Sequence, residues 1–188
     1  TAGSGNISGS GHKGQCAEVL IYDHPLSEDE RSQINQYVNS RYQAGKDESS
    51  PPVKGMQFWL DARDLDANPA TANPKNGTPI SKWIDKVSGA ALEQSKAKLQ
   101  PKLSTFGKSV AAAVEGSFLH GDGAKAAFAK DKKGSLVVVF SATHQGEGYG
   151  FEAGGNKAFI STVSYPKAGE KNSLESAIND INNPTFTA

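Results

Sequence analysis

The stretch "CAEVLIYDHPLSEDERSQINQYVNSRYQ", residues 16–43, holds the two patterns that decide the fold. It opens with an apolar run that only Glu18 interrupts, and such a run predicts a strand covered on at least one face. Ser27 and Glu30 have the spacing of a capping box, in which each side chain bonds the other residue's backbone N–H. The stretch therefore predicts a strand, a turn and a helix close to the first residue.

The predicted helix, near residues 27–43, is amphipathic. Gly45 is suited to end it, because glycine readily adopts the left-handed conformation found after helices. Its apolar side chains recur at helical spacing on one face. They are Ile34, Tyr37, Val38 and Tyr42. This face must be buried, either against the sheet of the same chain or in an assembly with another copy.

Composition excludes several classes of partner. The 188 residues include 20 basic and 20 acidic side chains, so the chain lacks the positive field that favours nucleic acid or an anionic membrane. The longest apolar run, residues 136–140, is far shorter than the roughly 20 residues that span a bilayer. We therefore expect a soluble chain without membrane insertion, whose export signal, if it has one, has been removed or lies outside the given sequence. The single cysteine, Cys16, excludes an internal disulfide and is expected to pack as a small hydrophobe.

Composition also divides the chain into zones. Residues 1–15 are rich in glycine and serine, which is typical of a flexible linker or of an edge strand between glycine turns. Residues 47–55, "DESSPPVKG", form the best candidate for a boundary between two structural pieces. Residues 1–46 and 56–188 are then the two pieces, with 47–55 as the linker.

The second piece is predicted to be almost entirely β. Short apolar or alternating segments bounded by turn residues predict its strands. They are "MQFWLDA" (56–62), "SKWIDKVSG" (81–89), "SLVVVFSAT" (135–143), and the hairpin of "YGFEAG" (149–154) and "AFISTVS" (158–164). One short helix is predicted at "SLESAIND", residues 173–180.

Residues 17–43 resemble the last strand and C-terminal helix of concanavalin A-like, laminin G-like jelly-roll modules. Those modules end in an Ala-Glu-Val-aliphatic-aliphatic-Tyr strand and a Leu-Ser-x-x-Glu helix that closes with Tyr. "FWLDA" (58–62) and "WIDKVSG" (83–89) resemble the opening of the same module in bacterial and phage surface proteins. The resemblance implies an all-β, antiparallel two-sheet jelly-roll sandwich with one amphipathic helix. It also implies an extracellular location, on a cell or virion surface.

The two ends of the module stand in reversed order, and three arrangements explain this. In the first, the chain is the end of one module joined to the start of the next. In the second, the two pieces complete one permuted sandwich within the chain. In the third, residues 1–46 complete the sandwich of a neighbouring copy. Repetition of the last contact from head to tail gives a filament.

The expected function is that of a non-enzymatic structural or adhesive module whose partners are other copies of the chain or adjacent modules. The alternative is a carbohydrate-binding module, free or within a polysaccharide-active enzyme, with a glycan as its partner. No Glu-x-Asp-x-x-Glu array supplies the paired carboxylates of a sandwich glycosidase. The acidic residues 28–30 fit the start of a helix, where the dipole favours negative charge.

Two binding sites follow from local patterns. Asp64, Asp66 and Asn68 place oxygen ligands at alternating positions, as in a Ca²⁺ site. The glycine and the distal glutamate of an EF-hand loop are missing, so a polar turn in which these side chains bond their own backbone is the favoured interpretation. Glycan-binding candidates on the loop around the predicted hairpin are Tyr149, Phe151 and Asn156.

Both tryptophans are expected in the core rather than on a sugar-binding surface. Trp59 lies inside an apolar strand and Trp83 precedes Ile84.

Overall fold

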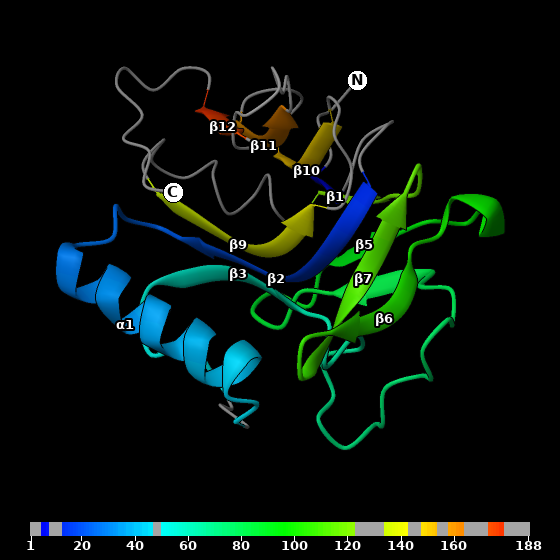
Figure 1. Cartoon of the computed structure of the whole chain (residues 1–188), viewed down its shortest axis with the longest axis horizontal. Helices are drawn as coiled ribbons and strands as arrows, with labels where there is room; N and C mark the ends of the chain where they lie inside the picture. Colours follow the sequence, from blue (N-terminus) through cyan, green and yellow to red (C-terminus); the bar gives the residue numbers. More distant parts are fainter. Residues whose placement is uncertain are drawn as a thin grey trace, which may run out of the picture.

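The computed structural model describes residues 5–7, 13–46, 50–122, 134–142, 148–153, 158–163 and 173–178. This part of the chain forms two antiparallel sheets and a single α-helix, the arrangement of a β-sandwich (Figure 1). The predicted all-β sandwich with one helix is therefore confirmed. No helix of the described part is long and apolar enough to cross a membrane.

The first sheet has five strands and is organised around β2. One edge of β2 pairs with β9 along most of its length, and the other edge pairs with β3 and then with β7. The strands are β2 (Lys13–Tyr22), β3 (Met56–Asp61), β6 (Lys102–Phe106), β7 (Ser109–Glu115) and β9 (Ser135–Ala142). The strand predicted in residues 16–22 is thus paired on both edges, within its own chain.

The second sheet has seven strands. Their order is β12 (Ser173–Ile178), β11 (Ala158–Val163), β10 (Gly148–Ala153), β1 (Gly5–Ile7), β8 (Leu119–Gly121), β5 (Ala91–Glu93) and β4 (Lys82–Ile84). The predicted hairpin is confirmed as β10 and β11.

Two predictions from the sequence disagree with the observed strands of this sheet. β12 is a strand paired with β11, so the helix predicted at residues 173–180 is wrong. Pairing with a neighbouring strand decided the conformation there, against local propensity. β1 lies between β8 and β10, so this piece of the glycine-rich segment is neither a free linker nor an edge strand.

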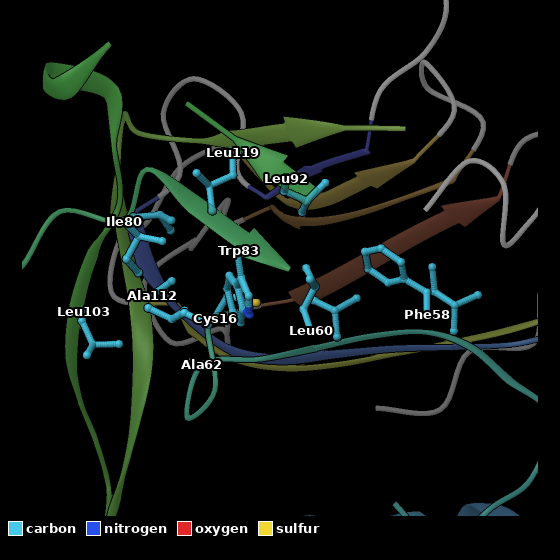
Figure 2. Packing of buried hydrophobic residues seen from close by; sticks show 14 residues of the cluster. Cys16, Phe58, Leu60, Ala62, Ile80, Trp83, Leu92, Leu103, Ala112 and Leu119 are labelled. Atoms are coloured by element: carbon cyan, nitrogen blue, oxygen red, sulfur yellow. The ribbon is translucent and has the colours of Figure 1, made fainter. Parts of the chain in front are cut away.

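The main core lies between the two sheets (Figure 2). Trp83 and Leu92 of the second sheet pack against Phe58 and Leu60 of the first, together with Cys16. All five side chains are almost completely buried. Burial of Trp83 confirms the prediction that it is a core residue, and burial of Cys16 confirms its packing as a small hydrophobe.

The opposite face of the first sheet carries α1 (Glu28–Val38), as Figure 1 shows. The predicted capping box is present: Ser27 Oγ accepts from Glu30 N–H, and Glu30 Oε2 accepts from Ser27 N–H. One wider turn, η1 (Asn39–Gln43), continues the helix with π-type hydrogen bonds. A separate short 3₁₀ turn, η2 (Ala97–Leu99), precedes β6.

The predicted apolar face of the helix lies on this sheet. Ile34 packs with Leu20 and Trp59, and Tyr42 packs with Ala17. Val38 contacts both groups, and the Tyr42 ring meets Phe106 edge to face, with centroids 5.7 Å apart. The helix face that we assigned to assembly is therefore covered by the chain's own strands.

A β-bulge in β2 sets which side chains point toward the helix. Alternation along the strand sends Val19 and Ile21 into the main core and Leu20 toward the helix. The register against β9 shifts between Cys16 and Glu18, so Ala17 and Glu18 both face the helix. The bulge thus turns a charged side chain onto the side where the helix lies, a common effect of bulges.

Candidate functional site

A cluster of polar side chains lies between the helix and the first sheet. We call it the buried polar network, and its members are Glu18, Tyr37, Arg41, Tyr42, Trp59 and Asp61. Glu18 on β2 and Asp61 on β3 are direct register partners. Glu18, Arg41 and Asp61 are 0%, 3% and 2% exposed, so three formally charged groups are removed from water.

Glu18 is the acceptor at the centre of the network. Its Oε1 accepts from Tyr37 Oη at 2.7 Å and from Trp59 Nε1 at 2.7 Å. Its Oε2 accepts from Tyr42 Oη at 2.8 Å. Both carboxylate oxygens are therefore satisfied, as a buried carboxylate requires. The donors come from the helix, from η1 and from β3, so one side chain joins three elements.

Arg41 compensates the buried negative charge. It donates to Asp61 Oδ2 and to Tyr37 Oη, and its Nη1 lies 3.9 Å from Glu18 Oε1. Its guanidinium also lies over the Tyr37 ring, 5.4 Å from the centroid. The π-type turn η1 carries both Arg41 and Tyr42, and it brings both side chains to the sheet.

Lys86 extends this charge pattern toward the surface. Its Nζ lies 2.6 Å from Asp64 Oδ2 and 3.7 Å from Asp61 Oδ2. The same ammonium lies 4.3 Å from the centroid of the Trp59 ring, in a cation–π contact. Two cations thus meet the carboxylate of Asp61.

The network shifts the pKa values of its members. Burial raises the pKa of Glu18, and the nearby Arg41 opposes that rise. Burial also raises the pKa values of Tyr37 and Tyr42, as does the negative charge of Glu18. Burial disfavours the charge of Arg41, but Asp61 and Glu18 hold its pKa above the usual range. Arg41 therefore stays protonated, and both tyrosines stay hydrogen-bond donors.

These contacts suit a structural role. A general acid or base must come within hydrogen-bond reach of its substrate, and Glu18 is fully buried beneath the helix. What the arrangement does is attach the helix to the sheet through hydrogen bonds and an ion pair, in addition to apolar packing.

The residues predicted to bind Ca²⁺ occupy a turn that uses their oxygens internally. Asp64 Oδ1 accepts from Asn68 N–H at 2.8 Å, and Asp66 Oδ1 accepts from the same N–H at 3.1 Å. Asn68 Oδ1 accepts from Ala70 N–H at 3.1 Å. Within the described ranges, no group of three or more His, Cys, Asp or Glu is placed to hold a metal ion. The Ca²⁺ site stays a prediction.

The glycan-binding candidates are only partly placed. Tyr149 and Phe151 belong to β10, where the register against β11 shifts between them. Asn156 lies outside the described residues. Trp59 is buried in the polar network, which confirms that it is not a sugar-stacking surface residue.

A pocket of about 330 Å³ opens beside the end of the helix. We call it the basic pocket, because four cations line it: Arg41, Lys46, Arg63 and Lys108. Gly45 and Ser109 line it as well, and no Asp or Glu is among the described residues at its wall. The pocket lies where the segment after η1, the β6–β7 turn and the loop after β3 meet.

Sequence reasoning missed the polar network and the basic pocket. Glu18 was recognised only as an interruption of an apolar strand, and Arg41 was not singled out. A signal was present: an acidic residue in a fully buried strand requires donors. The Tyr residues of the helix and Trp59 are such donors, but their spacing along the chain does not show that they converge.

His24 gives the start of the helix a pH dependence. Its Nδ1 lies 2.9 Å from Asp23 Oδ1 and its Nε2 lies 3.2 Å from Glu30 Oε1. The hydrogen bonds to Asp23 and Glu30 raise the pKa of His24. A raised pKa in the folded state stabilises the fold at pH values below the unfolded pKa, about 6.5. We expect this contribution to be lost as the pH rises through the higher folded pKa.

Thermal unfolding of the wild-type chain and of His24→Gln, followed by circular dichroism from pH 5 to pH 9, measures this effect. The Tm of the wild type is expected to fall as the pH rises above about 6.5, because the contribution of His24 is lost. This fall is expected to be smaller in His24→Gln. His120→Gln is the matched control, because His120 forms no ion pair with the described residues. Equal pH dependence in wild type and His24→Gln would show that the contacts of His24 contribute nothing.

Comparison of the chain with protein-family models, curated proteins and solved structures found no significant match. The geometry above is therefore the basis for a functional proposal.

Proposed function

We propose that this chain is a non-enzymatic, extracellular structural or adhesive module of the concanavalin A-like jelly-roll type. The observation that carries the proposal is the buried polar network, which attaches the helix to the sheet of the same chain. Buried charges with several hydrogen bonds form where strand and helix meet in a fixed arrangement. The resemblance of residues 17–43 to the ending of such modules supports the same interpretation.

The pairing of β2 supports closure within one chain over donation to a neighbour. A donated strand is inserted into the edge of another sheet and leaves its own chain incomplete. In this chain β2 bonds β9 on one edge and β3 and β7 on the other. We therefore propose that the reversed order of the two module ends reflects a permuted module.

A single substitution tests this arrangement. Cys16 on β2 and Ala112 on β7 are register partners, and both side chains face the main core. The Cα atoms of antiparallel partners lie roughly 4.5–5.5 Å apart, within the range for a disulfide. Ala112→Cys is expected to form an intrachain disulfide with the native Cys16. Non-reducing electrophoresis then shows a faster-migrating monomer that reverts on reduction.

The oxidation is best performed during refolding in a glutathione buffer, because burial raises the pKa of Cys16 to about 12 and suppresses its thiolate. Ala111→Cys is the matched control, since Ala111 is buried but packs with the helix-side residues. A covalent dimer or ladder from Ala112→Cys would instead show that β2 is exchanged between chains, and the permuted-module proposal would be wrong.

A second candidate function, carbohydrate binding, is favoured by the basic pocket. Concave sites with a few polar groups are where small ligands bind. This role is compatible with the first, because an adhesive module needs a surface that recognises its target.

A further inference from the structure

The basic pocket concentrates positive charge, although the net charge of the whole chain is zero. The sequence has 20 basic and 20 acidic residues, yet the described lining of this hollow has four cations and no carboxylate. A concave surface lined by one sign of charge focuses the electrostatic field on its interior. The pocket is therefore suited to an anion.

The cations that line the basic pocket differ in whether they form ion pairs with carboxylates of the protein. Arg41 is paired with Asp61 in the buried polar network. Lys46 and Lys108 form no ion pair with any carboxylate of the described ranges. With respect to the described part of the chain, their ammonium groups can therefore donate to a ligand without first breaking an ion pair.

The backbone holds Lys108 beside the helix end. Gly45 has a φ of +71°, and a Cβ at this position would lie 2.9 Å from Lys108 Cδ. A side chain larger than hydrogen therefore does not fit between the helix end and the stem of Lys108. The aliphatic part of Lys108 therefore lies close to the backbone of the helix end, beside the pocket.

Ser109 adds a hydroxyl to the wall of the pocket. Its Oγ is shielded from solvent and forms no hydrogen bond with the described residues. An unpaired shielded hydroxyl is unfavourable. A ligand oxygen in the pocket becomes its partner only after a rotation of the side chain or a shift of the β6–β7 turn that exposes this oxygen.

We propose that the basic pocket binds an acidic sugar unit, carrying a carboxylate or a sulfate, of an extracellular polysaccharide. This inference deepens the adhesive and carbohydrate-binding proposal and rests on it. Carboxylate and sulfate oxygens match the ammonium and hydroxyl donors. The volume of about 330 Å³ lies near the lower end of ligand pockets, roughly 300–1,000 Å³, so the pocket suits a small unit rather than a long chain.

Isothermal titration calorimetry at low ionic strength, with glucuronic acid, glucose and inorganic sulfate, tests the proposal. Glucuronic acid is expected to bind and glucose is not. The double variant Lys46→Gln/Lys108→Gln is expected to weaken glucuronic acid binding by about tenfold or more, because it removes two charged donors. Its Tm should match that of the wild type, since neither lysine is buried.

The matched control is Lys96→Gln/Lys98→Gln. These lysines are exposed, do not line the pocket, and give the same change in net charge. The control is expected to change the affinity by less than about twofold, because screening weakens distant charges. Equal weakening by both double variants would mean that net charge alone attracts the ligand, which overturns the pocket proposal.

Two other outcomes also overturn it. If glucuronic acid does not bind, the lysines serve only to complement the partial negative charge at the helix end. If inorganic sulfate binds as tightly as glucuronic acid, the pocket is an inorganic oxyanion site and does not recognise a sugar. If the chain in addition binds to a column of neutral polysaccharide, the adhesive function is supported and only the assignment of the pocket is wrong.

Discussion

Replacing Arg41 with methionine is expected to lower the free energy of unfolding by about 3–5 kcal/mol, the usual cost of removing one partner from a buried ion pair. The substitution leaves Asp61 without its guanidinium donor and removes the positive charge nearest to Glu18. Methionine fills a similar volume, so the decrease in the free energy of unfolding reflects the lost charge and hydrogen bonds rather than a new cavity. Guanidinium denaturation followed by the fluorescence of the buried tryptophans measures it.

Two further variants separate the interactions. Glu18→Gln keeps one of the two acceptor oxygens, which serves either Tyr37 and Trp59 or Tyr42, and burial already raises the pKa of Glu18. We expect it to cost only about 1–2 kcal/mol. Arg41→Met/Asp61→Asn should be less destabilised than the sum of its single variants, because the double variant no longer leaves Asp61 as a buried charge without its guanidinium partner. A loss below about 1 kcal/mol in Arg41→Met would show that the ion pair does not hold the helix on the sheet.

Replacing Trp83 with alanine is expected to cost about 3–5 kcal/mol, as large-to-small substitutions of buried aromatic residues do. Trp83 is 0% exposed and lies between the two sheets, where Figure 2 shows it beside Cys16 and Leu60. Its Nε1 also donates to the carbonyl of Asp61 at 3.1 Å. The variant therefore loses apolar contacts and leaves a carbonyl without this donor. Urea denaturation followed by far-ultraviolet circular dichroism gives the difference.

Trp83→Phe is the control that separates packing from hydrogen bonding. Phenylalanine retains most of the aromatic contact but cannot donate to Asp61, so we expect a cost of about 1–2 kcal/mol. If Trp83→Ala and Trp83→Phe were equally destabilised, the hydrogen bond rather than the packing of the sheets would determine stability at this position.

Local patterns predicted the helix and about half of the strands, because their signals lie within a few residues, whereas β5, β6, β7 and β8 were not predicted. The Ser27 and Glu30 side chains reach only across one turn, so their spacing identified the helix start. Alternation sends Phe58 and Leu60 to one face of β3 and Trp59 to the other, and the apolar run at β9 is equally local. The helix predicted at residues 173–180 failed because pairing with β11 is not visible in that segment.

The candidate sites could be predicted less well, because they form between distant segments. Trp59 Nε1 donates to Glu18 across 41 residues of chain, and Gly45 meets Lys108 across an even longer separation. The bulge at Ala17 breaks strict alternation, so a period of two counted back from Leu20 places Glu18 correctly but puts Ala17 and Cys16 on the wrong sides. Spacing rules describe neighbours along the chain, and these contacts join neighbours only in space.

The central position of β2 also has a consequence for the order in which the chain folds during synthesis. The partners of β2 are made after it, and the bond from Leu26 N–H to Ser135 Oγ joins residues 109 positions apart. At translation rates of roughly 5–20 residues per second, β2 waits several seconds on the ribosome before β9 emerges. The early helix can cover one face of β2 during that time, and β3 can pair with one edge, but the edge that β9 takes stays open. A chain built in this order depends on the speed of translation, and on chaperones, to keep its first strand from pairing with another copy.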